Sequence, residues 1–314
     1  AAAEGMPAVA LTDTNALFAA LEFSVKAMDE GVQPIVGCQV TLDAGPACGP
    51  VVLLAQDQGG WMNLMALSTC LYVTPVKNAP HVTMDELARH AAGLICLTGG
   101  ATGPLGQLAA AGKLDDARAH AAALHAIFGD RLFIELCRRG DAVEQAAEPA
   151  LLDLAYDRGW PIVATNPSCF EDADFVRAHD TMLCIAHSTY VESEDRPRSS
   201  PDAWMKPAEE MKALFADLPE AIANTLVVAQ RCAVAAPKRK PILPSLAGDR
   251  EGEAALLREQ ARAGLAARLA RIEELGAAPD AADWRDAYAT RLEFELDVII
   301  QMGFPGYFLI VADF

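Results

Sequence analysis

The stretch AVALTDTNALFAALEFSVKAM, residues 8–28, sets the pattern on which the chain is built: a short apolar run followed at once by a helical repeat. The apolar run at 8–11 predicts a buried strand, and a helix is predicted over 15–30, where Gly31 ends it. The helix carries one apolar stripe, formed by Leu17, Phe18, Leu21, Val25 and Met28. Because α/β barrels place their chemistry at such strand-to-helix junctions, Asp13 and Asn15 are candidate site residues.

The same alternation continues through the first half of the chain. Strands are predicted at 8–11, 34–42, 51–55, 94–98, 132–137 and 161–165, and helices at 15–30, 58–73, 103–127 and 142–158. Because these strands are continuous apolar runs separated by helices, we expect a parallel sheet covered on its outer face. Repeated units of this kind without a dinucleotide-binding glycine loop favour a closed α/β barrel over a doubly wound sheet. The carboxyl ends of barrel strands carry the chemistry, and Asp13 and Asn166 fall there.

Within the alternating part, a capping box at 83–86 opens another helix. From residue 171 the chain is predicted to be helical, with helices at 171–187, 207–216 and 219–233. The proline-rich stretch 237–248 is typical of a linker. Beyond it two long amphipathic helices are predicted, the first ending at Gly276 and the second running over 283–302. We therefore place a domain boundary near residue 245, which gives domains at 1–245 and 246–314.

Composition and charge limit the classes of function. The chain has 25 Lys and Arg against 43 Asp and Glu, and such an acidic surface repels phosphate backbones, so we do not expect it to bind nucleic acid over a wide face. Its eight cysteines form no CxxC pair, which indicates buried reduced thiols. No apolar run is long enough for a membrane span and no leader opens the chain, so we expect a cytoplasmic protein without membrane contact. Both ends break off within regular patterns, and we expect a fragment.

A catalytic metal site needs three or more good protein ligands and an open position. The side chains expected at the strand ends are Asp13, Asn15, Gln39, Arg139, Asn166 and Cys169. Amides are weak neutral ligands and an arginine repels a cation, so only Asp13 and Cys169 are good donors. The histidines show no metalloprotease spacing, the glycine-rich turn at 97–103 lacks the lysine of a phosphate loop, and no serine nucleophile elbow is present. The residues alone predict no catalytic metal site.

Two sets of residues resemble a known family. The strings RLEFEL at 291–296 and QMGFPGYFLIVADF at 301–314 closely resemble the opening of the polymerase core in the bacterial DNA polymerase III alpha-subunit family. Upstream, ALTDTNALFAALEF at 10–23, QPIVGC at 33–38 and VATN at 163–166 are similar to the amino-terminal PHP domain of that family. The resemblance covers essentially the whole chain. It implies a PHP-type distorted (β/α)7 barrel, whose first strand and His-x-His motif would precede Ala1, followed by the helical start of the polymerase palm.

The resemblance also implies a degenerate metal site. Thr14 stands where metal-binding members carry a histidine, Gln39 where they carry a glutamate, and Arg139 where they carry another histidine. Pro167 and Cys169 replace the acid and the histidine of an Asp-x-His motif. The positions of this vestigial metal cup are Asp13, Thr14, Asn15, Gln39, Arg139, Asn166 and Cys169. We expect no bound metal there, and we expect Asp13 and Asn15 to cap the following helix instead.

For function, the resemblance implies the replicative DNA polymerase, whose two-metal chemistry uses Mg²⁺ held by aspartates that would lie beyond Phe314. The chain by itself should therefore hold no catalytic residue and no cofactor. The expected role of the barrel is to support the polymerase core and to dock the proofreading exonuclease subunit epsilon, while other replisome subunits and DNA bind regions outside this chain. Two alternatives stay open: an active PHP metal-dependent phosphoesterase or 3′–5′ exonuclease, and an error-prone paralogue of the same polymerase family.

Overall fold

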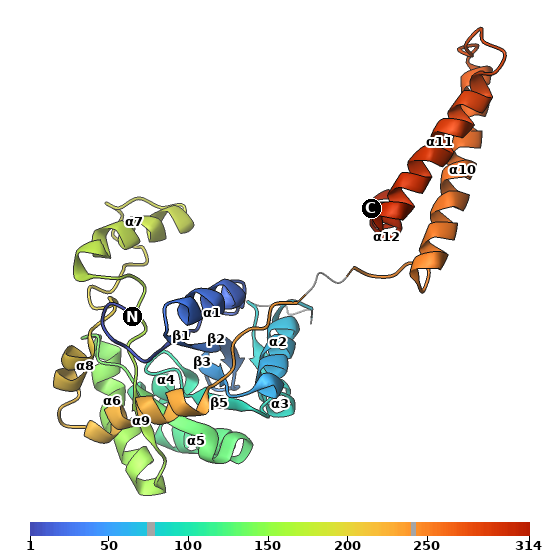
Figure 1. Ribbon diagram of the computed structural model, residues 1–314. Helices are drawn as coiled ribbons and strands as arrows, with labels where there is room; N and C mark the ends of the chain where they lie inside the picture. Colours follow the sequence, from blue (N-terminus) through green and yellow to red (C-terminus); the bar gives the residue numbers. More distant parts are fainter. Residues whose placement is uncertain (74–78, 240–242) are drawn as a thin grey trace. The chain divides into compact units, whose positions relative to one another are not determined.

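The computed structural model describes residues 1–73, 79–239 and 243–314. These residues form two compact units, Ala1–Lys238 and Arg239–Phe314, which are described separately (Figure 1). The units divide between Lys238 and Arg239, at the start of the predicted linker, of which residues 240–242 lie outside the described part of the chain. The functional domain boundary at 245 stays a prediction.

The first unit is built on one mixed sheet. Its strands are β1 (Ala8–Leu11), β2 (Gln33–Asp43), β3 (Cys48–Ala55), β4 (Val82–Thr83), β5 (Leu94–Leu97), β6 (Leu132–Leu136) and β7 (Ile162–Ala164). The order is β1-β2-β3-β5-β6-β7, with β4 paired to β2. Among the described strands no pairing joins β1 to β7, so the sheet forms a half-barrel and not a closed ring. The α/β barrel-like class predicted from the sequence is confirmed, but closure is not.

The prediction of an all-parallel sheet is wrong, because β3 runs antiparallel to both β2 and β5. The connection between β2 and β3 is a tight turn in which the Ala44 amide donates to the Ala47 carbonyl at 3.0 Å. So short a connection can join only antiparallel strands, since a parallel pair needs a long crossover. The pairs β1–β2, β5–β6 and β6–β7 are parallel as expected.

Helices cover the sheet of the first unit. They are α1 (Ala20–Asp29), α2 (Gln58–Val73), α3 (Met84–Arg89), α4 (Pro104–Ala110), α5 (Leu114–Phe128), α6 (Ala142–Arg158), α7 (Val176–Ala186), α8 (Ala208–Leu214) and α9 (Pro219–Arg231), with short 3₁₀ turns η1 (Gly129–Arg131) and η2 (Ala173–Phe175). The single helix predicted over 103–127 is two helices, because Gly112 adopts a positive φ of 69° between α4 and α5. The predicted capping box of Thr83 and Glu86 at the start of α3 is confirmed.

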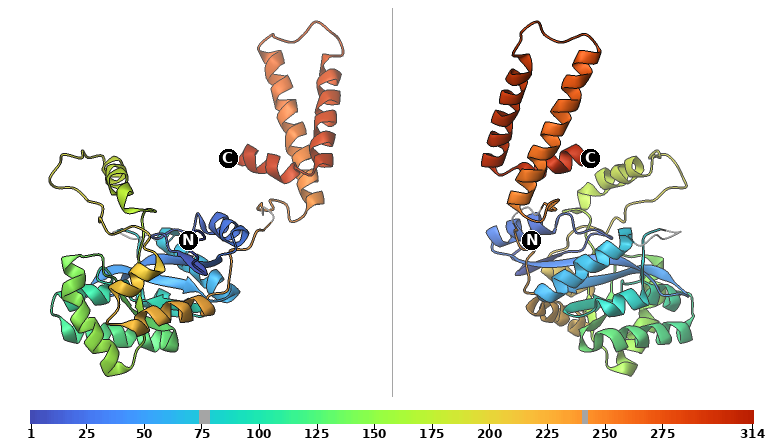
Figure 2. Two further views of the ribbon diagram at one scale, coloured as in Figure 1. Left: turned by 60° about the vertical axis from the view of Figure 1, so that its left-hand side comes forward. Right: turned by 90° about the vertical axis from the view of Figure 1, so that its right-hand side faces the viewer.

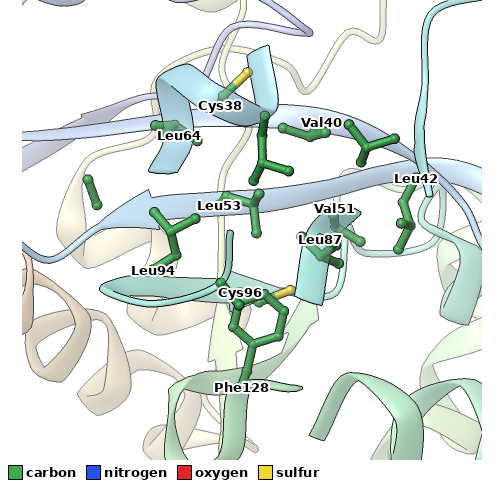
Figure 3. Close-up of a cluster of buried hydrophobic side chains, with 14 of the residues drawn as sticks. Cys38, Val40, Leu42, Val51, Leu53, Leu64, Leu87, Leu94, Cys96 and Phe128 are labelled. Carbon is green, nitrogen blue, oxygen red and sulfur yellow. The ribbon is translucent and has the colours of Figure 1, made fainter. Parts of the chain in front are cut away.

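The core of the first unit lies on both faces of the central strands. On one face, side chains of β2, β3 and β5 such as Val40 and Leu53 pack against Leu64 of α2, Leu87 of α3 and Phe128 of α5 (Figure 3). On the other face, a cluster from β2, β3, β5, β6 and β7 packs against Val228 of α9 and the neighbouring Cys232. Burial on both faces explains why these strands are continuous apolar runs.

Helix α1 differs from its prediction in start and in orientation. It begins at Ala20, after a turn, and not near residue 15. An apolar stripe usually faces the core, but here Leu17 alone of the five stripe residues packs against the buried cluster, and the other four are exposed. The buried face instead carries Ala20 and Ser24, whose hydroxyl donates to the Ala20 carbonyl and accepts from the Ala236 amide.

The second unit is a helical hairpin with a third short helix: α10 (Arg250–Glu274), α11 (Trp284–Met302) and α12 (Pro305–Asp313) (Figure 2). The two long helices confirm the sequence prediction. Leu257 of α10, Leu296 of α11 and Leu309 of α12 form the apolar cluster of this unit. Ion pairs join Arg258 and Arg262 of α10 to Glu293 of α11. No single helix within the described residues is long and apolar enough to cross a membrane; α11 and α12 pass that test only as a pair, which is bent by 113°.

Candidate functional site

The structure brings four of the predicted cup residues together at the ends of β1 and β2. Thr14 forms a parallel bridge with Gln39, which extends the β1–β2 ladder beyond Leu11. The Asn15 amide donates to the Gln39 carbonyl at 2.8 Å, and the Gln39 amide donates to the Asp13 carbonyl at 3.1 Å. The backbone at this edge is therefore held as sheet, and the side chains of Asp13 and Thr14 are exposed.

The prediction that Asp13 and Asn15 cap α1 is wrong. The N-cap position of α1 is Ala19, without a side-chain hydrogen bond. Asn15 has a φ of 53°, a left-handed conformation that asparagine tolerates better than most residues. Its side chain turns to β2: Nδ2 donates to Thr41 Oγ1 at 3.0 Å, and Oδ1 accepts from the Thr41 amide at 2.9 Å. Both ends of the Asn15 amide are thus used in joining β1 to β2.

The remaining cup residues follow β6 and β7. Arg139 Nε donates to Glu144 Oε1 at 3.0 Å, and the Arg139 backbone amide donates to Glu144 Oε2 at 2.6 Å. Asn166 Nδ2 donates to the Trp204 carbonyl at 2.9 Å. The Cys169 amide donates to the Ala203 carbonyl at 2.7 Å, and its side chain is exposed. These residues thus tie the loops after β6 and β7 to α6 and to the segment before α8.

No hydrogen bond or ion pair within the described parts joins the Asp13–Asn15 group to the Arg139–Cys169 group. The described residues also contain no group of three or more His, Cys, Asp and Glu side chains that could hold a metal ion. What the strand ends do offer is amides and a guanidinium that are already bonded to protein atoms. The strand-end residues therefore form structural contacts. The exposed reactive groups among them are the carboxylate of Asp13 and the thiol of Cys169.

Sequence reasoning missed Glu135, the most deeply buried acid near these strand ends. Its residue exposure is 3%, in the middle of the apolar strand β6. The carboxylate accepts from Thr165 Oγ1 at 2.7 Å and from the Gly99 amide at 2.9 Å, while the Glu135 amide donates to Thr98 Oγ1 at 3.0 Å. Glu135 therefore joins the carboxyl ends of β5, β6 and β7. A charged residue within an apolar run was the signal that could have revealed it.

Burial sets the protonation of the groups around Glu135. Burial raises the pKa of the Glu135 carboxyl above its ordinary value, and the hydrogen bonds from Thr165 and Gly99 oppose that shift. Burial also raises the pKa of the nearby Cys137 thiol, which lies 3.1 Å from Thr165 Oγ1, and the negative charge of Glu135 adds to this effect. On strand β2, farther along the sheet, burial raises the pKa of Cys38 to about 11. Thiols held protonated in this way are poor metal ligands and poor nucleophiles.

Comparison with known proteins places this sequence in a family. The PHP domain family matches residues 1–139, and the family described as the bacterial DNA polymerase III alpha NTPase domain matches residues 255–314. The DNA polymerase III subunit alpha of Caulobacter vibrioides is 46% identical over 325 aligned residues, which cover 100% of this chain. The chain belongs to the DNA polymerase III alpha family.

Other DNA polymerase III alpha subunits align over nearly the same range. That of Rickettsia bellii is 37% identical over 98% of this chain, and that of Vibrio cholerae is 36% identical over 100% of it. The chain spans 28% of the Caulobacter protein and 27% of the other two, just over a quarter of the length of these relatives. The resemblance carried by the strings at 10–23 and 301–314 is therefore confirmed for the family.

Membership in the DNA polymerase III alpha family shows which part of the structure to compare with the predicted metal cup. The half-barrel is the PHP domain, and its strand ends are where the sequence placed the vestigial cup. On one side of that position Asn15 is bonded to Thr41 of β2, and on the other Arg139 is bonded to Glu144 of α6. The interpretation of the cup as vestigial stays a prediction, which metal analysis can test.

Proposed function

We propose that this chain is the PHP unit and the beginning of the polymerase core of a replicative DNA polymerase III alpha subunit. In the whole subunit, DNA-templated DNA synthesis would use Mg²⁺ held by carboxylates beyond Phe314, so that residues 1–314 bind neither the catalytic metals nor the reacting nucleotide. The match to relatives named DNA polymerase III subunit alpha over the full chain carries this proposal.

Within the subunit, we propose that the PHP unit is a scaffold that supports the core and docks the proofreading exonuclease subunit epsilon. The support comes from the bonds of the strand-end residues. The Arg139 guanidinium is held by the buried Glu144, so the carboxylate of Glu144 is already paired and is not free to bind a cation. Asn15 and Asn166 direct their amides to the protein. Residues that would serve a metal centre in other PHP domains thus serve contacts between loops.

Metal analysis of the full-length subunit tests the scaffold proposal. We expect no stoichiometric zinc, manganese or iron after purification, and no Mn²⁺- or Zn²⁺-dependent 3′–5′ exonuclease activity. We also expect Asp13→Ala to leave primer extension unchanged, with Glu4→Ala, another exposed acid of the same unit, as the matched control. Stoichiometric metal together with an exonuclease that Asp13→Ala abolishes would replace this proposal by an active phosphoesterase.

Binding and replication assays test the rest. We expect calorimetry to detect binding between the full-length subunit and the purified epsilon subunit of the same organism. Depletion of the subunit in cells should stop chromosome replication. Continued replication with loss of damage-induced mutagenesis alone would identify the error-prone paralogue instead.

A further inference from the structure

Residues 171–201 form an excursion from the first unit, which we call the α7 arm. The chain leaves the half-barrel after β7 and returns before α8, and between these points it contains η2, α7 and a long loop. Figure 1 and Figure 2 show α7 and this loop standing apart from the sheet. None of the apolar clusters of the first unit contains a residue between 165 and 210, all of which the structure describes. The core of the half-barrel therefore does not hold the α7 arm.

The α7 arm also has almost no apolar core of its own. Within 171–201, all of it described, Cys184 is the one buried apolar residue, with an exposure of 3%. Ile185 and Tyr190 are instead exposed by 74% and 77%. A segment of this size buries too little apolar surface to offset the entropy of ordering its chain, and small folded segments usually need an additional cross-link. The contacts that keep the arm ordered are therefore polar.

A polar cross-link joins α7 to the loop that follows it. The Arg196 guanidinium donates twice to the Asp180 carboxylate, from Nη1 to Oδ1 at 2.8 Å and from Nη2 to Oδ2 at 2.7 Å. The Ser199 amide also donates to Asp180 Oδ1 at 3.0 Å. The Arg196 side chain is only 2% exposed, so this contact is shielded from water. Pairs of this two-pronged geometry between arginine and a carboxylate are among the stronger polar contacts in proteins.

The arm is joined to the half-barrel by a narrow neck. Phe170 forms a parallel bridge with Trp204, and the Phe170 ring lies 5.3 Å from the ring of His179 at the base of α7. Beyond this neck, the hydrogen bonds and ion pairs that residues 171–199 make with other described residues all stay within the arm. The polar contacts of the arm thus hold its own parts together and do not hold it to the sheet.

We propose that the α7 arm is an order–disorder element that opens and refolds independently of the half-barrel, and that the Asp180–Arg196 pair is the latch that keeps it ordered. A region with few buried apolar contacts opens at a lower free energy than the core to which it is attached. Opening breaks the latch and releases the loop between residues 181 and 195. The strand ends stay closed, because Asn166 and Cys169 bond to the neck and not to the arm. No partner and no DNA are needed for this opening.

Hydrogen exchange of the full-length subunit, followed by mass spectrometry, tests the latch. In the wild type we expect the amides of α7 to be protected, but at least about tenfold less than those of β6. Arg196→Ala should raise the exchange rate of the α7 amides at least about tenfold, because it leaves Asp180 without its paired charge, and should change β6 by less than about twofold. Arg198→Ala is the matched control, because Arg198 lies in the same loop but donates to the Ser193 carbonyl at 3.4 Å. It should change the exchange of α7 by less than about twofold.

Cleavage by chymotrypsin after Tyr190 gives a second measurement. Tyr190 lies in the loop that the latch closes, and neither substitution changes the bond that is cut. Because a protease attacks the open state, we expect faster cleavage in Arg196→Ala than in Arg198→Ala or the wild type. Equal cleavage of the three proteins would contradict the proposed latch.

The exchange data separate the two parts of the proposal. Equal protection of α7 and β6 in the wild type would show that the arm opens together with the half-barrel, which overturns its independence. Loss of protection in β6 as well as α7 in Arg196→Ala would do the same. An unprotected α7 in the wild type, an unchanged α7 in Arg196→Ala, or an equal effect of Arg198→Ala would overturn the assignment of the latch.

Discussion

Glu135 should control the local stability of the strand ends on which the PHP unit is organised. Replacing it by alanine leaves the Thr165 hydroxyl and the Gly99 amide without their acceptor. A buried donor without a partner costs about 1–3 kcal/mol, so we expect Glu135→Ala to lower the local free energy of opening by roughly 2–4 kcal/mol. Glutamine keeps the shape: its oxygen can accept from Gly99 and its amide can donate to Thr165. Glu135→Gln should therefore cost no more than about 1 kcal/mol.

Hydrogen exchange is the appropriate assay, because it reports on the amides of β5, β6 and β7 separately in a chain with two units. A loss of about 2.7 kcal/mol would raise the exchange rate of the protected amides roughly a hundredfold in Glu135→Ala. The amides of α10 and α11 serve as the internal control, since they belong to the other unit. Equal protection in Glu135→Ala and the wild type would refute the reasoning that Glu135 joins the three strand ends.

The pH dependence gives an independent check on Glu135. Its folded-state pKa is raised above the ordinary value of 4.5 by burial, so the folded state holds the proton more tightly than the unfolded state does. The favourable contribution of the protonated carboxyl is therefore complete below pH 4.5 and is lost as the pH rises through the folded-state pKa. We expect the protection of wild-type β6 amides to fall over that window and that of Glu135→Gln not to. Parallel pH profiles for the two proteins would contradict the raised pKa.

Three further substitutions test individual contacts, each by thermal or chemical denaturation followed by circular dichroism. Arg138→Ala should destabilise the first unit by about 2–3 kcal/mol, because it leaves the half-buried Glu148 unpaired and removes the guanidinium from the Phe215 ring; equal stability would exclude a role for this ion pair. Gly99→Ala should cost roughly 2–4 kcal/mol, since its φ is 83° and a Cβ would lie 1.9 Å from the Pro50 carbonyl oxygen; a stable variant would contradict that geometry. Arg262→Ala should change the helical hairpin by less than about 1 kcal/mol, because its pair with Glu293 is largely exposed, and any effect should disappear at high salt.

Much of the architecture follows from local sequence patterns. The apolar runs predicted the strands correctly, because β2, β3 and β5 are buried on both faces and therefore consist mostly of apolar residues. The capping box of Thr83 and Glu86 and the stop at Gly276 mark helix ends through hydrogen bonds between near neighbours. The family was evident from the string at 301–314, which is long and unusual. Each of these signals depends on residues close together in the chain.

The candidate site was less accessible from sequence. The identity of the residues at the strand ends was predicted, but their partners were not. Asn15 bonds to Thr41 and Arg139 to Glu144, whereas a capping role was expected at Asn15. Glu135 was overlooked because one acid within an apolar run gives no local reason for its burial. Its reason is the approach of Gly99 and Thr165, which lie more than 25 residues away on either side.

The sequence by itself determined the order and type of most elements, the division into a sheet-containing part and a helical part, and the family. The tertiary structure alone decided that β3 runs antiparallel, that α1 turns its small residues inward and its large apolar residues outward, and that an acid joins three strand ends. The physical reason is that the spacing of hydrophobic residues along the chain shows only which positions of a helix or strand are apolar. Which apolar face meets the core, and which strands become neighbours, depends on packing between segments that are distant in the chain.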